Sequence, residues 1–297
     1  MTLRNIIPEF LRYIRFEKRM SELTFTAYHN DLLQFTSYLQ KEYELEDADD
    51  IKHIHLRSWL AGMKEEGLSE RTLQRKISTL KSLFKYAMRL KLVQSNPTKL
   101  LVAPKAPKRL PVFLEQEQTV AIEAMRNYPD GFEGDTERLI IEMLYQCGLR
   151  RAELIGLKES DIEFSRKQIR VLGKRNKERM IPVSDELLID LKHYMDEKRK
   201  IFNQPSVNLL CLMSGKELYP NYVYRVVTRH LKNVTTLVKK SPHVLRHTFA
   251  TQLSNNGADL NAIKELLGHS SLAATQIYTQ TNISRLQEVY RKAHPKS

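Results

Sequence analysis

Apolar residues in the first hundred positions recur every three or four residues, which is the spacing of amphipathic helices. One such stripe follows Ser21, a favourable N-cap residue, and consists of Phe25, Leu32, Phe35 and Leu39. An acidic connector, residues 42–50, follows it, and a further helix around Trp59 ends near Gly67. The N-terminal region, residues 1–102, is therefore predicted to be a helical domain.

The helix predicted after Ser69 has two different faces. Its core stripe consists of Leu73, Ile77, Leu80, Phe84 and Ala87. A second line of residues carries cations and hydroxyls: Arg71, Arg75, Ser78, Ser82, Lys85 and Arg89. Eleven basic residues and no acidic ones lie between Arg71 and Arg109, Lys76 among them. This one-signed charge favours a surface that follows nucleic-acid phosphates, although an ordinary solvated basic face is the alternative.

Three prolines and three cations in residues 103–111 predict an extended linker rather than a helix or a central strand. The pattern changes after it, so residues 112–297 are predicted to form a second domain. Its helices are expected near 115–127, 138–147, 186–202, 219–238 and 284–293, with another after Pro242. Short strands are expected near 162–164, 168–172 and 179–183. The fold class is therefore mainly α with a small three-stranded sheet.

Charge narrows the choice of partner. The 297-residue chain has 41% hydrophobic residues, enough for two cores, and a net charge of +13. This balance favours a polyanion such as nucleic acid, with a merely soluble basic protein as the alternative. Two cysteines, Cys147 and Cys211, provide no disulfide framework, so a reducing, cytoplasmic location is expected. The N-terminal residues do not have the pattern of a signal peptide, and no membrane span is expected.

The candidate chemistry begins in residues 241–278. His243 and Arg246 lie one turn apart on the helix predicted after Pro242. A second arginine, Arg150, follows the break at Gly148, and Glu153 is placed to orient its guanidinium. Two arginines suit the neutralisation of a phosphate in a reaction without metal, because each planar guanidinium grips two oxygens.

Cleavage of a phosphodiester also requires a nucleophile and an acid. Tyr278 suits the nucleophile, helped by a histidine such as His243, and Lys174 on a predicted hairpin suits the acid that protonates the leaving 5′ oxygen. Each residue has a plainer alternative as packing or solvated surface. The spacing of His243 and His247 also allows zinc, but the glutamate of a metalloprotease motif is replaced by Val244, so no metal is predicted.

Taken together, five ordered motifs resemble the tyrosine recombinase, or phage integrase, family, and most closely its Xer-type members. They are G-L-R-x-x-E-L (148–154), V-L-G-K-x-N-K-E-R-x-I-P-V (171–183), H-x-L-R-H-T-F-A-T (243–251), L-L-G-H-S (266–270) and I-Y-T (277–279). The resemblance implies a SAM-like helical core-binding domain and a mainly helical catalytic domain with a small antiparallel sheet. It implies six catalytic residues, with Tyr278 as the nucleophile: Arg150, Lys174, His243, Arg246, His269 and Tyr278.

The resemblance also implies a reaction and an assembly. Four protomers, alike or related, would synapse two double-stranded DNA sites, cut through a 3′-phosphotyrosyl bond and rejoin strands without ATP, metal or other cofactor. The expected roles are resolution of chromosome dimers or movement or inversion of a DNA element. The tail after Tyr278 is expected to dock on a neighbouring protomer. Two alternatives stay open: a non-cutting DNA-binding protein on the same scaffold, and a type IB topoisomerase.

Overall fold

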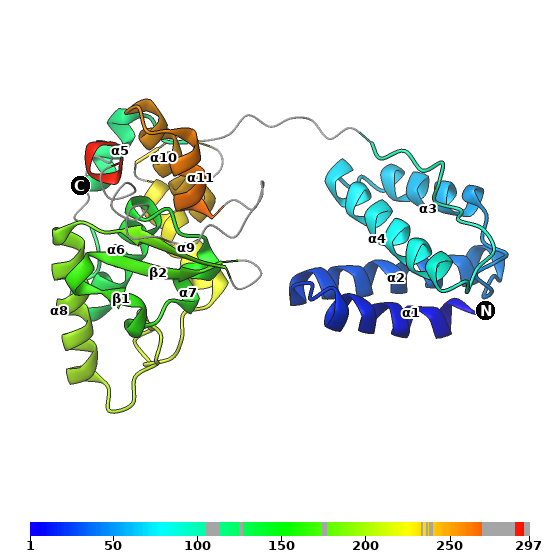
Figure 1. Cartoon of the computed structure of the whole chain (residues 1–297), viewed down its shortest axis with the longest axis horizontal. Helices are drawn as coiled ribbons and strands as arrows, with labels where there is room; N and C mark the ends of the chain where they lie inside the picture. The colour runs from blue at the N-terminus through cyan, green and yellow to red at the C-terminus, as the bar shows by residue number, and fades with distance from the viewer. Residues whose placement is uncertain are drawn as a thin grey trace. The chain divides into compact units, whose positions relative to one another are not determined.

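The computed structural model forms two compact units, Met1–Arg109 and Leu110–Ser297 (Figure 1). It describes residues 1–104, 113–124, 127–173, 177–232, 234–235, 237, 240–268 and 289–293. Each unit has its own buried apolar cluster and is considered by itself.

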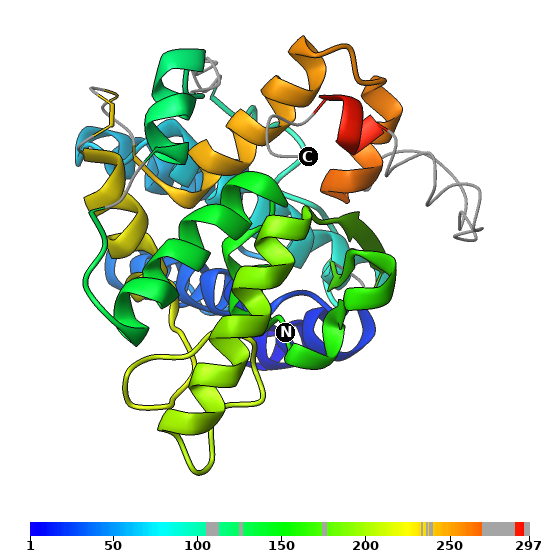
Figure 2. The same ribbon diagram turned by 90° about the vertical axis from the view of Figure 1, so that its left-hand side faces the viewer.

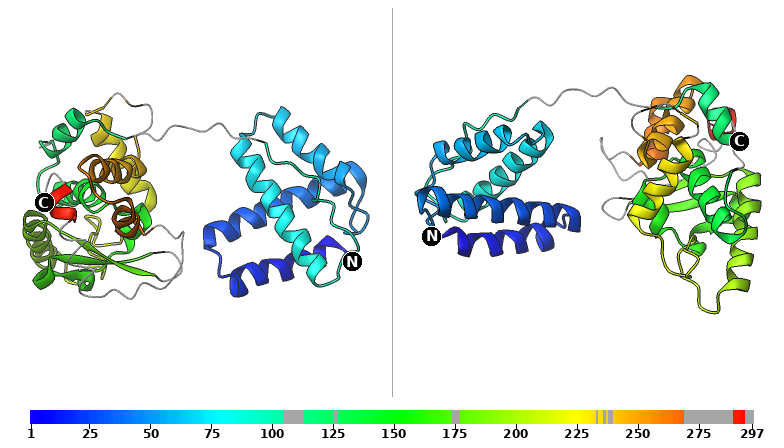
Figure 3. Two further views of the ribbon diagram at one scale, coloured as in Figure 1. Left: turned by 45° about the horizontal axis from the view of Figure 1, so that its top comes forward. Right: turned by 180° about the vertical axis from the view of Figure 1, so that it is seen from behind.

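Unit 1 is a helical bundle. Its α-helices are α1 (Leu3–Arg12), α2 (Glu22–Tyr43), α3 (His53–Glu65) and α4 (Glu70–Arg89), with a short π-helical turn at Tyr13–Glu17. The side chains of Ser21 and Ser69 cap α2 and α4 by accepting the backbone N–H of Thr24 and Thr72. Helix α4 packs against the other three, and Figures 1 and 3 show the bundle. The predicted core stripe of α4 is buried throughout.

In unit 2, helix α6 (Phe132–Gln146) lies at the centre and packs against α7 (Arg151–Gly156), α8 (Asp185–Ile201), α9 (Pro220–Lys232) and α10 (Pro242–Asn255). Eleven of its fifteen residues are buried, which explains its strongly apolar sequence. Helix α5 (Gln116–Glu123) precedes it, and α11 (Leu260–Leu267) packs on α10.

An antiparallel sheet of order β1-β2-β3 completes unit 2 (Figure 1). Its strands are β1 (Ile162–Glu163), β2 (Gln168–Leu172) and β3 (Glu178–Pro182). Ile169 pairs with both Ile162 and Ile181, and all three side chains are buried. Alternation therefore turns Ile169, Val171 and Ile181 toward the core, whereas Leu172, at the end of β2, is exposed. The mainly helical fold with a small antiparallel sheet confirms the predicted fold class.

Some helix boundaries differ from the predictions. Helix α6 begins at Phe132, six residues before the predicted start, because the Phe132 ring stacks on Tyr194 with centroids 4.7 Å apart. Acidic residues in its first turn, Glu133 and Asp135, stabilise the N-terminus of the helix, but in the sequence this stretch has the composition of a loop. Helix α9 ends at Lys232 rather than at Val238, where the apolar pattern was expected to continue.

Candidate active site

A buried carboxylate, that of Glu153, collects arginines from three parts of unit 2. Its Oε1 accepts hydrogen bonds from Arg150 Nη1 at 2.7 Å and from Arg179 Nη1 at 3.0 Å. Its Oε2 accepts from the backbone N–H of Arg150 and from Arg179 Nη2, both at 2.8 Å. Arg246 Nη1 lies 3.7 Å from Oε2. Glu153 therefore accepts hydrogen bonds from two guanidinium groups and lies within ion-pair distance of a third.

The charge of Glu153 is maintained by these partners. Burial alone disfavours the carboxylate, but the hydrogen bonds and charge of Arg179, followed by the contacts with Arg150, lower its pKa to about 2. Glu153 is therefore fully ionised at neutral pH and holds the cations around it by charge-assisted hydrogen bonds.

Arg150 is positioned by a tight turn before α7. It is the N-cap residue of that helix, and Glu153 at position N3 accepts the N-cap backbone N–H. The turn passes through Gly148, whose φ of +57° suits glycine and whose missing Cβ leaves room for the Phe249 ring. Arg150 Nη2 also donates to the carbonyl of Gly268 at 3.2 Å, and its side chain stays 26% exposed.

Arg246 approaches the same carboxylate from α10. Its Nη1 donates to the carbonyl of Gly148 and its Nη2 to that of Leu267, each at 2.5 Å. Burial, followed by the nearby charge of Arg150, lowers the pKa of Arg246 to about 10, so it remains a cation at neutral pH. The structure thus brings the two predicted arginines, Arg150 and Arg246, to one side chain.

His243 lies in the first turn of α10, directly after Pro242 at the first helical position. The three-residue spacing places it on the same side of the helix as Arg246. His243 is exposed, whereas Arg246 is buried. The neighbouring His247 is half-buried, and its ring lies 6.2 Å from that of Phe113. Within the described ranges, no three histidine, cysteine or acidic side chains gather as metal ligands.

Three predicted site residues, Lys174, His269 and Tyr278, lie outside the described residues. The segments that lead to two of them are described. Lys174 follows β2, whose end is closed by a hydrogen bond from Gly173 N–H to the Lys177 carbonyl at 2.7 Å. His269 follows Gly268, the left-handed C-cap of α11, whose carbonyl accepts from Arg150.

Arg179 was not singled out from the sequence. It is the second residue of β3 and follows a charged hairpin, yet it is only 3% exposed. The signal available was its place inside the motif at 171–183, where three other basic residues, Lys174, Arg175 and Lys177, make it inconspicuous.

The predicted basic face of α4 is divided in the structure. Arg71, Ser78, Lys85 and Arg89 are exposed, and Arg75 and Ser82 are half-buried. The guanidinium of Arg89 lies 4.4 Å from the centroid of the Tyr13 ring. Lys76, counted from the sequence as part of the basic run, is instead buried. It donates to Asp31 at 2.9 Å because its place on the helix faces α2.

Asp31 is the buried anion of unit 1. It also accepts hydrogen bonds from Arg75 and from the Thr79 hydroxyl. Arg75, Lys76 and Asp31 help to line a small pocket of about 270 Å³ together with Asn30, Gln34 and Thr72. One predicted DNA-contact residue, Arg75, is therefore held by a carboxylate inside its own unit.

The described end of the tail, residues 289–293, is helical and packs on its own chain. Tyr290 and Ala293 are buried in a cluster with Phe249, Leu253 and Leu266. Asn256 Nδ2 donates to the Ala293 carbonyl at 2.6 Å. Figure 2 shows this short red helix beside α10 and α11. The sequence predicts docking on a neighbour, whereas the single chain buries these residues intramolecularly.

Comparison with known proteins matches both units to domains of one protein family. Residues 113–285 match the phage integrase family, and residues 7–91 match the phage integrase N-terminal SAM-like domain. Tyrosine recombinase XerC of Pelotomaculum thermopropionicum is 38% identical over 304 residues, 98% of each chain. Tyrosine recombinase XerD of Staphylococcus epidermidis is 33% identical over 297 residues, 99% of this chain and 100% of the relative.

Solved structures show the same fold. The XerH site-specific recombinase bound to difH substrate, in a pre-cleavage complex, is 27% identical and has a TM-score of 0.67. The match covers 90% of this chain and 78% of XerH. A lambda integrase dimer bound to a COC' core site is 21% identical with a TM-score of 0.69, and it covers 93% of this chain and 100% of that chain.

The chain therefore belongs to the phage integrase family of tyrosine recombinases. Its function is that of an Xer-like tyrosine site-specific recombinase, an enzyme that breaks and rejoins DNA. Among the residues with a described position, no helix is both long enough and apolar enough to cross a membrane.

Proposed function

We propose that this chain recombines specific double-stranded DNA sites through a tyrosine-linked intermediate, with Arg150 and Arg246 neutralising the phosphate that is attacked. The observation that carries the proposal is that both guanidinium groups meet at Glu153, Arg150 Nη1 by a hydrogen bond of 2.7 Å and Arg246 Nη1 at an ion-pair distance of 3.7 Å. A pentacoordinate phosphate gains negative charge as the nucleophile approaches, and two fixed guanidinium groups stabilise that charge without having to reorganise.

In the proposed reaction, the phenol oxygen of Tyr278 attacks the scissile phosphorus. A bond from this oxygen to phosphorus forms, the bond from phosphorus to the 5′ oxygen breaks, and the DNA 3′ end stays attached as a phosphotyrosine. The phenol proton leaves with help from His243, and Lys174 protonates the departing 5′ oxygen. His269, which follows the Gly268 carbonyl bound by Arg150, is assigned to phosphate stabilisation.

Rejoining reverses these bonds with a 5′ hydroxyl from a partner strand as the nucleophile. The phosphodiester energy is kept in the phosphotyrosine, so this scheme needs no ATP, metal or other cofactor. The full event has two DNA sites and four protomers, alike or related. The tail would have to leave its intramolecular contacts with α10 and α11 to join a neighbour. The XerH complex with difH and the lambda integrase dimer on a core site support a DNA partner.

DNA contacts are assigned to the basic face of α4: Arg71, Arg75, Ser78, Ser82, Lys85 and Arg89. The exposure of Arg71, Lys85 and Arg89 supports this assignment. Cations at such positions gain affinity by displacing counterions from phosphates, and the two serines suit polar contacts to phosphate or base edges.

The nucleophile is tested with a nicked suicide duplex. Its site is first selected by the purified protein from random-sequence DNA. The wild-type chain is expected to form a covalent complex that survives denaturation, and Tyr278→Phe is expected to form none. A covalent band of equal yield from Tyr278→Phe would remove Tyr278 from its role.

The acid is tested separately with a 5′-bridging phosphorothiolate, whose sulfur leaves without a proton. Lys174→Ala should cleave ordinary DNA slowly and this substrate at close to the wild-type rate. An equal defect on both substrates would show that Lys174 does another task. Relaxation of supercoiled plasmids that lack any selected site would favour the topoisomerase alternative.

A further inference from the structure

Arg179 joins three segments of unit 2 that lead to proposed catalytic residues. It lies on β3, downstream of the hairpin that carries Lys174. Its Nη1 and Nη2 donate to the two oxygens of Glu153, the residue that holds Arg150. Its Nε donates to the Leu266 carbonyl at 2.7 Å, two residues before Gly268 and three before His269.

The geometry of the Arg179–Glu153 pair fixes a direction as well as a charge. The guanidinium meets the carboxylate through two parallel hydrogen bonds, so the carboxylate plane cannot rotate without breaking one of them. Both partners are almost completely buried. The remaining acceptor positions of Glu153 then face Arg150, and Arg246 lies on the Oε2 side.

Arg179 also supports the turn after α11. A Cβ on Gly268 would lie 3.2 Å from both Cδ and Nη1 of Arg179, so the arginine side chain lies close against the glycine backbone. Gly268 has a φ of +61°, and its carbonyl receives Arg150 Nη2. One buried side chain therefore contacts both the anchor of Arg150 and the turn to which Arg150 also binds.

We propose that Arg179 is a positioning residue for catalysis: it orients the Glu153 carboxylate so that Arg150 presents its guanidinium group to the same phosphate as Arg246. This inference rests on the phosphate-binding role proposed above for those two arginines. Arg179 itself is too buried to touch DNA. Its loss would leave Glu153 held only by Arg150, so the guanidinium group of Arg150 would lose its fixed acceptor. Arg246 would keep its hydrogen bonds to the carbonyls of Gly148 and Leu267 but would lose the fixed position of the neighbouring carboxylate.

A neutral substrate separates positioning from stability. Replacing one non-bridging oxygen of the scissile phosphate by methyl removes its negative charge, so aligned arginines matter less in the transition state. Loss of a residue that positions the arginines should therefore slow cleavage of the phosphate substrate strongly and cleavage of the methylphosphonate substrate much less. A residue that only stabilises the fold should be needed equally on both.

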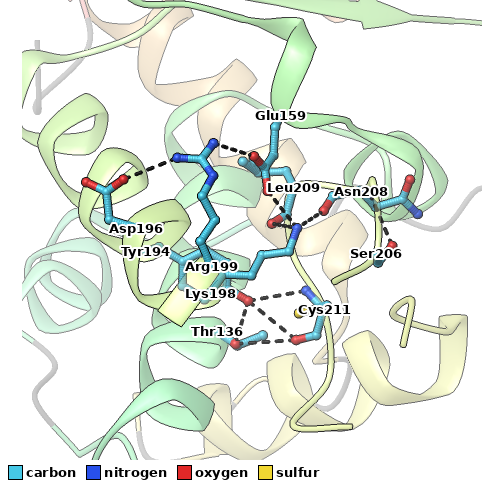
Figure 4. A network of polar contacts seen from close by, with 10 residues as sticks. All are labelled: Thr136, Glu159, Tyr194, Asp196, Lys198, Arg199, Ser206, Asn208, Leu209 and Cys211. Carbon is cyan, nitrogen blue, oxygen red and sulfur yellow. Dashed lines mark hydrogen bonds and ion pairs between the residues drawn. The ribbon is translucent and has the colours of Figure 1, made fainter. Parts of the chain in front are cut away.

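The experiment compares single-turnover cleavage by Arg179→Met and Arg179→Lys on the two suicide duplexes. The matched control is Lys198→Met, which removes another buried cation of the same unit (Figure 4). Lys198 donates to Glu159 and to the carbonyls of Asn208 and Leu209, a set of partners different from that of Arg179. Thermal unfolding and DNA affinity are measured for every variant.

We expect Arg179→Met to cleave the phosphate substrate about 100-fold more slowly than wild type, the scale of losing one transition-state donor. Its defect on the methylphosphonate should be below about 10-fold, and Lys198→Met should show equal defects on both. If Arg179→Met does not fold, Arg179→Lys decides, since it keeps the charge but loses the two-pronged contact. Equal defects of the folded Arg179 variant on both substrates would overturn the inference. Failure of wild type to form any covalent complex would instead overturn the proposed function.

Discussion

Glu153 holds Arg150 at two points: Oε2 accepts the backbone N–H at 2.8 Å, and Oε1 accepts Nη1 of the side chain at 2.7 Å. The same carboxylate therefore ends the turn before α7 and aims the arginine that begins the helix. The carboxylate that caps the start of α7 therefore also positions an arginine of the proposed phosphate site.

Glu153→Gln should weaken both stability and catalysis. The amide keeps the shape of the side chain but removes the charge, and its NH₂ group faces guanidinium donors. Breaking a buried ion pair in this way should lower the free energy of unfolding by about 3 kcal/mol at pH 7. Covalent complex formation should fall about 100-fold. Chemical denaturation and the suicide duplex measure the two effects, and a variant with wild-type values for both would contradict this role.

The pH dependence of stability tests the ionisation of Glu153. Its pKa is lowered from 4.5 to about 2 in the folded chain, so the unfolded state binds a proton at higher pH than the folded state does. The stabilisation is complete above about pH 4.5 and is lost as the pH falls toward 2. The difference in unfolding free energy between wild type and Glu153→Gln should therefore shrink over this range. A difference that stays constant from pH 6 to pH 2.5 would show that the charge of Glu153 does not stabilise the folded chain.

Gly148→Ala should destabilise unit 2. The residue has a φ of +57°, and an added Cβ would lie 2.4 Å from Cδ1 of Phe249. Strain and overpacking together should cost about 1–3 kcal/mol. Gly156→Ala is the matched control, because its Cβ would have open space at the end of α7. Thermal melting that shows equal, small shifts for both variants would rule out the close approach of Phe249.

Asp31→Asn should destabilise unit 1 by about 3 kcal/mol, because it leaves the buried ammonium of Lys76 without its counter-charge. The control is Glu46→Gln, which removes an exposed partner of Arg4 and should change stability by less than about 0.5 kcal/mol. Denaturant titration of the full chain, monitored by the fluorescence of Trp59, reports on the unfolding of this unit. Equal stabilities for the two variants would show that the Asp31 network is dispensable.

The basic face of α4 is tested by the salt dependence of DNA affinity. If Arg71 and Lys85 each neutralise a phosphate, Arg71→Ala and Lys85→Ala should each reduce the slope of log K against log salt by about 0.9. Lys41→Ala removes another exposed cation of unit 1, 81% exposed, and should leave the slope unchanged. Unchanged slopes for Arg71→Ala and Lys85→Ala would exclude this face as the phosphate contact.

Local patterns predicted the elements because each depended on neighbours in the sequence. The three strands were expected within one residue of their observed ends, and the Ser21 and Ser69 caps are present as expected. The contact of Glu153 with Arg150 could also be predicted from the sequence, because the two residues are three positions apart at the start of one helix. The start of α6 could not be predicted in this way, because its first turn has the composition of a loop and the stacking of Phe132 on Tyr194 depends on a distant residue.

Long-range pairing was the part that the sequence concealed. Arg179 reaches Leu266 across 87 positions, and Lys76 reaches Asp31 across 45, so neither partner is visible in a local window. Both cations lie among other basic residues, and composition alone assigns all of them to a solvated or DNA-facing surface. Only the packing of β3 on α11 and of α4 on α2 separates the buried cations from the exposed ones.

The central claim is that Arg150 and Arg246 act together on one phosphate, and a double-mutant cycle on cleavage rates tests it most directly. Arg150→Met and Arg246→Met should each slow covalent complex formation by about 100- to 1,000-fold. The double variant should be little slower than the worse single variant, because residues that act as a unit are not additive. Arg150→Met combined with Arg229→Met, whose partner is Glu137, should be additive. Multiplication of the two defects in the Arg150→Met, Arg246→Met protein, leaving cleavage about 10⁴-fold or more below wild type, would contradict the account.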